Sequence, residues 1–200
     1  MENIFVNTRS SIKLTGIKTI YFDPLDIEGA PQDADMVFIT HEHYDHFSPD
    51  DIKKVIKKNS QIIVPETMLS IVREMEFMHG VIPFQEGKDE DIKWQGIPAY
   101  NIDKPYHLKS NNWLGYLVEM DGKTYYAMGD TDVTKEVAMV EADVVFVPIG
   151  GKYTMDATEA ALFIKEKKPG LVVPIHYGDS EVAETFVRLL SPNMETKVFW

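Results

Sequence analysis

The strongest constraint on this chain is the hexapeptide from His41 to His46, which reads His-Glu-His-Tyr-Asp-His. It follows the apolar run 36–40, whose length and β-branched residues predict a buried strand. Because His41, His43 and Asp45 are spaced by two, an extended backbone would point all three side chains the same way. Imidazole nitrogen and carboxylate oxygen are ligands that zinc and similar divalent metals prefer. The hexapeptide therefore predicts a metal site at a strand end.

The alternative is a solvated loop that happens to be rich in histidine. Half of the six histidines of the chain fall within this hexapeptide, and the hexapeptide leaves a predicted strand, where functional side chains are often placed. These two observations favour metal binding over the solvated loop.

Length and composition limit the other possibilities. The chain has 200 residues, 44% of them hydrophobic, so we expect one domain over 1–200 with one good core. A formal net charge of -12 without a basic stripe argues against a nucleic-acid partner. There is no cysteine, which excludes disulfides and thiolate-bound metals. The N-terminus does not read as a signal peptide and no apolar run approaches about 20 residues, so we expect a cytoplasmic protein that does not span a membrane.

The rest of the chain predicts a mixture of strands and helices. Predicted strands cover 4–6, 12–14, 19–22, 61–64, 91–100, 114–120, 123–128, 144–148 and 171–175, the first three as an antiparallel meander. Predicted helices cover 49–56 with Ser48 as N-cap, 67–75, 156–167 and 181–190. Asp121-Gly122 is a strong hairpin signal.

Two polar residues outside the hexapeptide are open to two interpretations. Asp23, after the third strand, is a turn residue or faces the metal site, and the turn is favoured. His79 is predicted to sit at a helix end and not to bind metal.

Three apolar strands end in residues able to bind a metal. They lead into His41, into Gly129-Asp130 and into His176. Separate strands can converge on one edge of a sheet, so residues this far apart in sequence can meet in space. Alone, Asp130 would be taken for a turn aspartate and His176 for a buried structural histidine. Together with the hexapeptide, both are better explained as ligands.

These motifs, in this order and spacing, resemble the metallo-β-lactamase superfamily. The string His-x-His-x-Asp-His at 41–46 is followed by Gly-Asp-Thr at 129–131 and by Pro-Ile-His-Tyr-Gly at 174–178. The Gly-Gly-x-Tyr-Thr-Met stretch at 150–155 also resembles the small hydrolases related to the L-ascorbate-6-phosphate lactonase group. The resemblance implies an α+β fold, a four-layer αββα sandwich with a two-metal site at one edge.

The resemblance also implies roles for individual residues. His41 and His43 would bind the first metal, Asp45, His46 and His176 the second, and Asp130 would bridge both. Asp45 would also orient the attacking hydroxide, so Asp45 and Asp130 are the expected catalytic residues. The metals would be zinc, with manganese or iron as alternatives.

The sequence departs from the family pattern at one position. The family usually supplies a third histidine to the first metal just after the strand that here ends at Ala99, and the matching position is Asn101. Either the loop folds back to deliver His107, or the first metal has fewer protein ligands; His107 is favoured.

The implied function is a metal-dependent hydrolase that uses a metal-bound hydroxide on a small ester, lactone or phosphoester. Lys104 or Tyr177 could bind an anionic group of the substrate, although surface roles are equally compatible with the sequence. The alternatives are a nuclease or phosphodiesterase of the same superfamily, and a non-hydrolytic metal-binding or redox protein on this scaffold. Superfamily nucleases usually carry an inserted nucleic-acid-binding domain, and the related di-iron flavoproteins usually have glutamate at the position of His43. The substrate and the oligomeric state are left open.

Overall fold

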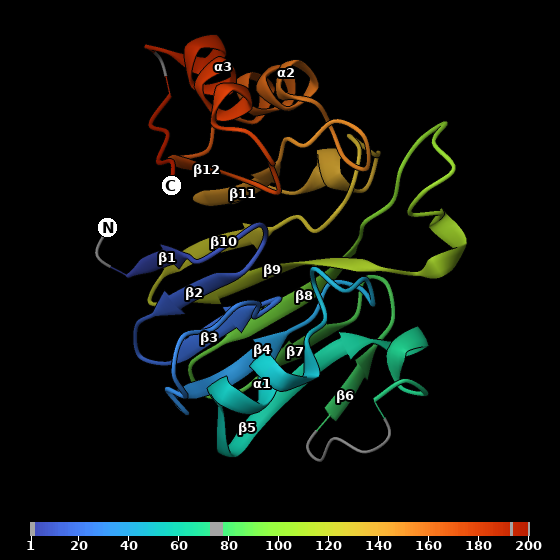
Figure 1. Cartoon of the computed structure of the whole chain (residues 1–200), viewed down its shortest axis with the longest axis vertical. Helices are drawn as coiled ribbons and strands as arrows, with labels where there is room; N and C mark the ends of the chain where they lie inside the picture. The colour runs from blue at the N-terminus through green and yellow to red at the C-terminus, as the bar shows by residue number, and fades with distance from the viewer. Residues whose placement is uncertain (1–2, 73–77, 193, 200) are drawn as a thin grey trace.

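The computed structural model describes residues 3–72, 78–192 and 194–199, and it contains two six-stranded sheets (Figure 1). The first sheet has the strand order β1-β2-β3-β4-β5-β6, with β1 (Ile4–Val6), β2 (Ile12–Thr15), β3 (Thr19–Phe22), β4 (Ala34–Phe38), β5 (Ile56–Pro65) and β6 (Met78–Val81). The second has the order β12-β11-β10-β9-β8-β7, with β7 (Glu86–Lys88), β8 (Lys93–Pro98), β9 (Leu114–Met120), β10 (Lys123–Ala127), β11 (Val144–Pro148) and β12 (Leu171–Ile175).

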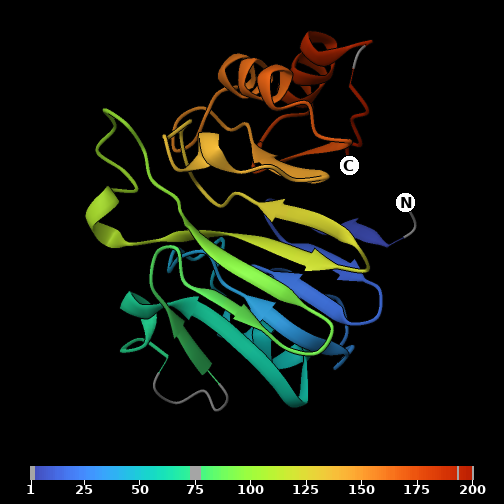
Figure 2. The ribbon, with the colours of Figure 1, turned by 180° about the vertical axis from the view of Figure 1, so that it is seen from behind.

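Three helices of seven or more residues pack on the outer faces of the sheets. They are α1 (Pro49–Val55), α2 (Ala157–Lys167) and α3 (Ser180–Leu190). Three short 3₁₀ turns, η1 (Glu66–Met68), η2 (Lys109–Asn111) and η3 (Val137–Met139), lie in the connections. In the described part of the chain no helix lies over β7 to β9, which face the viewer in Figure 2.

Three apolar clusters hold the layers together. The first lies between the sheets and combines residues such as Phe38 and Ile63 of the first sheet with Tyr116 and Phe146 of the second. The second joins β10, β11 and β12 to α2 and α3, and the third joins the first sheet to α1. The order helix, sheet, sheet, helix confirms the predicted αββα sandwich.

The strand directions determine where functional side chains gather. Strands β3, β4, β5 and β6 run parallel, and so do β10, β11 and β12. Strand β8 runs in the same direction as β10, because both are antiparallel to β9. The loops that follow these strands carry Asp23, the hexapeptide, His107, Asp130 and His176. Their carboxyl ends therefore form a natural place for a site.

Many predicted elements agree with the structure. The strands predicted over 19–22, 114–120, 144–148 and 171–175 coincide with β3, β9, β11 and β12. Ser48 caps α1 as predicted, with its hydroxyl accepting from the backbone N–H of Asp51. Asp156 caps α2 in a capping box with Glu159. The hairpin at Asp121-Gly122 joins β9 to β10, with a φ of 54° at Asp121.

The helix predicted over 67–75 is wrong. The chain forms only η1 and further turns up to Val72, and the predicted residue Met75 lies outside the described residues. Met68 and Val72 are buried, but Leu69 and Ile71 are exposed, so the apolar residues do not share one buried face. His79 lies exposed in β6 and not at a helix end. The edge strands β6 and β7 were not predicted.

The two sheets are joined by direct hydrogen bonds beneath the hexapeptide. The hydroxyl of Tyr116, in β9, donates to the carbonyl of Ile39 over 2.9 Å. The backbone N–H of Leu114, in the same strand, donates to the carbonyl of Thr40 over 3.1 Å. Both acceptors immediately precede His41, so these bonds fix the point at which the chain leaves the first sheet.

We expect Tyr116→Phe to lower the free energy of unfolding by about 1 kcal/mol or more, because a buried carbonyl loses a donor. Tyr126→Phe is the matched control. Tyr126 is also buried, but among the described residues its hydroxyl has no hydrogen-bond partner, so its removal should be neutral or stabilising. Urea unfolding of both variants measures the difference. Equal losses in the two variants would contradict a role for the Tyr116 bond.

Candidate metal centre

The hexapeptide forms a tight turn after β4, so the side-chain alternation of an extended backbone does not apply to it. The backbone N–H groups of His46 and Phe47 both donate to the carbonyl of His43, over 2.9 and 2.8 Å. The turn therefore separates side chains that alternation would have kept together. His41 and His43 point one way, whereas Asp45 and His46 face the loop of His176.

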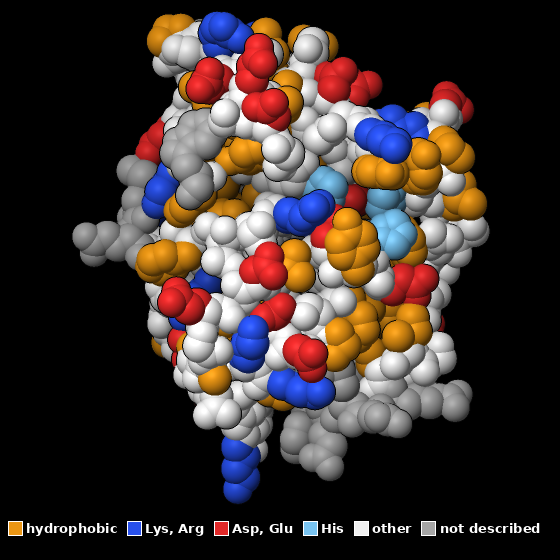
Figure 3. All heavy atoms as spheres, viewed as in Figure 1, with side chains coloured by type: hydrophobic (Ala, Val, Ile, Leu, Met, Phe, Trp, Pro, Cys, Tyr) orange, Lys and Arg blue, Asp and Glu red, His pale blue; other side chains and the backbone are white. Residues whose placement is uncertain are grey.

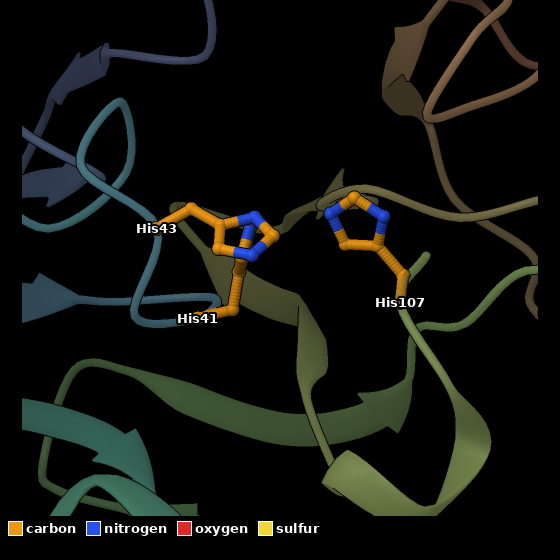
Figure 4. A group of neighbouring side chains, drawn as sticks. All are labelled: His41, His43 and His107. Carbon is orange, nitrogen blue, oxygen red and sulfur yellow. The ribbon is translucent and has the colours of Figure 1, made fainter. Parts of the chain in front are cut away.

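The first group of candidate ligands consists of His41, His43 and His107. One ring nitrogen from each lies within 4.8 Å of the others. Nε2 of His41 is 3.2 Å from Nδ1 of His43. Figure 4 shows His41 and His43 leaving the same loop while His107 faces them from the connection between β8 and β9.

Asp130 lies between this group and the rest of the cluster. The carboxylate is 3.4 Å from Nε2 of His46, and 3.3 Å from Nε2 of both His107 and His176. Two overlapping sets complete the cluster: His41, His46 and Asp130, and Asp45, His46 and His176. The structure thus brings together all seven residues singled out in the sequence.

The backbone around the cluster is locally strained. His107 and His176 have φ values of 49° and 51°, a region that histidine seldom adopts. Gly129, directly before Asp130, has a φ of 66°, and a side chain there would lie 3.2 Å from both the carbonyl of Leu114 and Cβ of Thr40. Strain of this kind often persists at functional sites, because the surrounding structure holds it in place.

Buried atoms in the cluster fit metal ligation. Nε2 of His46, Nε2 of His107 and Oδ1 of Asp130 are buried, and each is without a hydrogen bond among the described residues. Leaving such atoms unpaired is costly, whereas a cation placed among them would satisfy them together. The donor set of imidazoles and carboxylates suits zinc, manganese or iron.

The remaining nitrogens of two histidines are held by polar neighbours. Nδ1 of His46 lies 2.7 Å from Oδ2 of Asp23, and Nδ1 of His41 lies 2.9 Å from the hydroxyl of Thr40. Thr40 donates its hydroxyl and its backbone N–H to Asp23, each over 2.7 Å. This arrangement leaves Nε2 of both rings directed at the cluster, which is how outer partners orient metal-binding histidines.

Electrostatics favours the ligating form of most of these groups. Burial lowers the pKa of His41 and His43, which keeps both imidazoles neutral. Burial alone would raise the pKa of Asp45, but the hydrogen bond from His176 and the nearby histidines hold it at about 2. Burial opposes charge on His46, yet the carboxylates of Asp130 and Asp23 raise its pKa to about 10. An added cation would compete with that proton.

A family model described as "Beta-lactamase superfamily domain" matches residues 10–176. The chain belongs to the beta-lactamase superfamily.

Individual relatives and solved structures support this family membership. A UPF0173 metal-dependent hydrolase of Pyrococcus abyssi is 30% identical over 181 residues, covering 82% of this chain and 79% of the relative. A solved structure from Parabacteroides distasonis, named as a metal-dependent hydrolase, is 26% identical with a TM-score of 0.85, covering 98% of this chain and 91% of its own. Igni18, a metallo hydrolase from Ignicoccus hospitalis, shares the fold at 21% identity with a TM-score of 0.79, covering 98% and 94%. The prediction of a metal-dependent hydrolase is confirmed at that level.

In this member of the superfamily, His107 rather than Asn101 faces the cluster. The side-chain amide of Asn101 donates to the carbonyl of Tyr153 over 2.8 Å and lies 3.4 Å from Nδ1 of His107. Asn101 therefore packs behind His107. The backbone N–H of Asn101 also donates to the carbonyl of His107 over 2.9 Å, which closes the loop.

The two residues suggested for anion binding have other partners. Nζ of Lys104 bonds Asp132 over 2.6 Å and the carbonyl of Thr154 over 2.7 Å, so it braces two loops. The hydroxyl of Tyr177 donates to the carbonyl of Phe199 over 2.7 Å. These contacts support the structural alternative for both residues.

One neighbour of the cluster was not predicted from the sequence, and the role of another was predicted wrongly. Trp113 is buried, and its ring centroid lies 4.8 Å from those of His41 and His43. No sequence signal separates it from a core tryptophan. The favoured interpretation of Asp23 as an ordinary turn residue is wrong. Asp23 does lie in a bend, with a φ of 45°, but its carboxylate is buried against Thr40 and His46.

We expect Asp23→Asn to lower the free energy of unfolding by about 2 kcal/mol, because the new amide nitrogen would face the donors of Thr40 and His46. Asp26→Asn is the matched control, since Asp26 has a similar φ of 52° but an exposed side chain. That control should change stability by less than about 0.5 kcal/mol. Chemical unfolding compares the two variants. If Asp23→Asn were as stable as the control, that result would contradict a supporting role for Asp23.

Proposed function

We propose that the chain hydrolyses a small ester, lactone or phosphoester with the aid of two divalent metal ions. The observation that carries this proposal is the overlap of the three ligand groups. His41 belongs to two of them, His46 belongs to two, and Asp130 lies within 3.4 Å of three different histidines. A single-metal site would need only one such group, whereas two adjacent ions would share the carboxylate between them.

The proposed ligand sets follow from the contacts. His41, His43 and His107 would hold the first ion, and Asp45, His46 and His176 the second, with Asp130 shared. Zinc is the ion that this donor set suits best, with manganese or iron as alternatives. When bound, such ions lower the pKa of a water molecule toward about 7 and polarise a carbonyl or phosphoryl oxygen.

Protein side chains would position the attacking water and shield the site. Oδ2 of Asp45 is held by Arg9, over 3.0 Å, and lies 3.4 Å from Nε2 of His176. The low pKa of Asp45 keeps it a carboxylate. Its second oxygen can therefore accept a hydrogen bond from the attacking water. Trp113 covers one side of the histidines and excludes water from that wall.

The alternatives have weaker support. A nuclease needs cations that follow a nucleic-acid backbone, and the net charge of -12 opposes such binding. The related di-iron flavoproteins usually have a glutamate where this chain has His43.

None of the described helices has the length and apolar character needed to cross a membrane.

We expect Asp45→Asn to reduce kcat by about 10²-fold or more while the protein still folds, because asparagine keeps the shape but loses the charge. The substrates are a panel of esters, lactones and phosphodiesters, assayed with zinc- and with manganese-loaded protein. Asp50→Asn is the matched control, since its side chain is 90% exposed and close in sequence.

Thermal unfolding and metal analysis establish that each variant is folded and loaded. Near-normal kcat in folded, metal-loaded Asp45→Asn would contradict the role of Asp45. Loaded wild-type protein that cleaves none of the three substrate classes would contradict the proposed function.

A further inference from the structure

A hollow of about 350 Å³ opens directly beside the metal centre. His176 lines it, and Nε2 of the same residue lies 3.4 Å from Asp45 and 3.3 Å from Asp130. A molecule in this hollow would therefore lie next to the proposed reaction site. A larger hollow, of about 510 Å³, lies over β7 to β9 and contains none of the cluster residues.

The hollow is basic although the protein is acidic. Arg9 and Lys152 line it, and no aspartate or glutamate is among its described lining residues. Over the whole sequence acids outnumber Lys and Arg by 32 to 20. Two cations and no acid favour an anion in this hollow, whereas the net charge of the protein opposes anion binding.

Arg9 is held in place by the backbone. Its carbonyl accepts a hydrogen bond from the backbone N–H of His176 over 3.1 Å, which joins the two loops. Both residues have left-handed φ values, 47° at Arg9 and 51° at His176. Neither is glycine, so this backbone is costly and is maintained by the contact between the loops.

The guanidinium of Arg9 has donors that Asp45 does not use. One of them, on Nη1, binds Asp45 over 3.0 Å, and the side chain is 46% exposed. Arginine carries five donors in a planar fork, which suits a carboxylate or a phosphate. Among the described residues Asp45 is the only partner of this side chain.

Lys152 supplies the second charge from the loop after β11. Its Nζ lies 5.0 Å from the ring centroid of Tyr153, which also lines the hollow. No carboxylate lies within ion-pair distance of Lys152 in the part of the chain that the structure describes. In Figure 3, Lys or Arg side chains lie next to the histidines that reach the surface.

We propose that this hollow selects substrates that carry an anionic group, a carboxylate or a phosphate, apart from the bond that is cleaved. Arg9 and Lys152 bind that group while the scissile bond lies beyond His176. This inference rests on the proposed hydrolase function and narrows its substrate class. Arg9 also contacts Asp45, so Lys152 gives the cleaner test of anion binding.

The test uses three 4-nitrophenyl esters that share a leaving group and chain length. One is the monoester of adipate, one its neutral methyl ester, and one the ester of 5-phosphonopentanoate. Wild-type protein should have a kcat/KM at least about tenfold higher for an anionic ester than for the neutral one. The carboxylate and phosphonate arms show which anion is preferred.

Lys152→Gln and Arg9→Gln should each lower kcat/KM for the anionic esters by about tenfold, mainly through KM. Lys152→Gln should leave the neutral ester unchanged. The controls are Lys123→Gln and Arg188→Gln, which remove exposed cations from β10 and α3. If Arg9→Gln lowers kcat for all three esters equally, Arg9 acts only through Asp45. If Lys152→Gln also affects the three esters equally, the proposal is overturned.

A binding measurement separates this inference from the proposed function. Zinc-loaded, ¹⁵N-labelled protein is titrated with adipamic acid, a monoanion, and with neutral adipamide. Signals of Arg9 Nε and of the Lys152 amide should move with the monoanion only. The Arg9 signal should move less in Lys152→Gln, and the Lys152 signal should move less in Arg9→Gln. Shifts without hydrolysis of these esters, or of any substrate in the panel of esters, lactones and phosphodiesters, would retain the anion site and contradict the hydrolase proposal. Hydrolysis without charge selectivity and without shifts would retain the hydrolase proposal and contradict the anion site.

Discussion

A buried carboxylate needs compensating charge, and the arrangement around Asp130 meets that need. Its side chain is almost fully buried, and three histidines from three different loops surround it. Burial would raise its pKa, but the interactions with the neighbouring histidines hold that pKa well below the ordinary value. Each of those loops follows a strand that ends at the same edge, so the positions of the strands determine the chemistry of the site.

The two sheets contribute unequally to this edge. The first supplies the hexapeptide, and the network of Thr40 and Asp23 fixes which nitrogens of His41 and His46 are free. The second supplies His107, Asp130 and His176. The bond from Tyr116 to Ile39 and the bond from Leu114 to Thr40 join the two halves directly beneath the cluster. Packing between the sheets is thus coupled to the geometry of the site.

Much of the fold could be predicted because local patterns were strong. Buried parallel strands such as β11 and β12 read as continuous apolar runs, and their ends were predicted to the residue. The edge strands β6 and β7 are short and lack such a run. The stretch 67–75 has helical spacing, but the apolar residues of its described part, 67–72, do not share one buried face. The seven clustered residues were found because several strands end in metal-binding side chains. Asp23, Trp113 and Arg9 could not be assigned, since their roles depend on contacts between segments far apart in sequence.

Crystals of the zinc-loaded protein, measured at the zinc absorption edge, test the central claim most directly. We expect two anomalous peaks, one among His41, His43 and His107 and one among Asp45, His46 and His176, with Asp130 bound to both. A single peak in fully loaded protein, or peaks away from these residues, would contradict the two-metal site. A first peak bound by Asn101 in place of His107 would contradict the ligand set proposed for it.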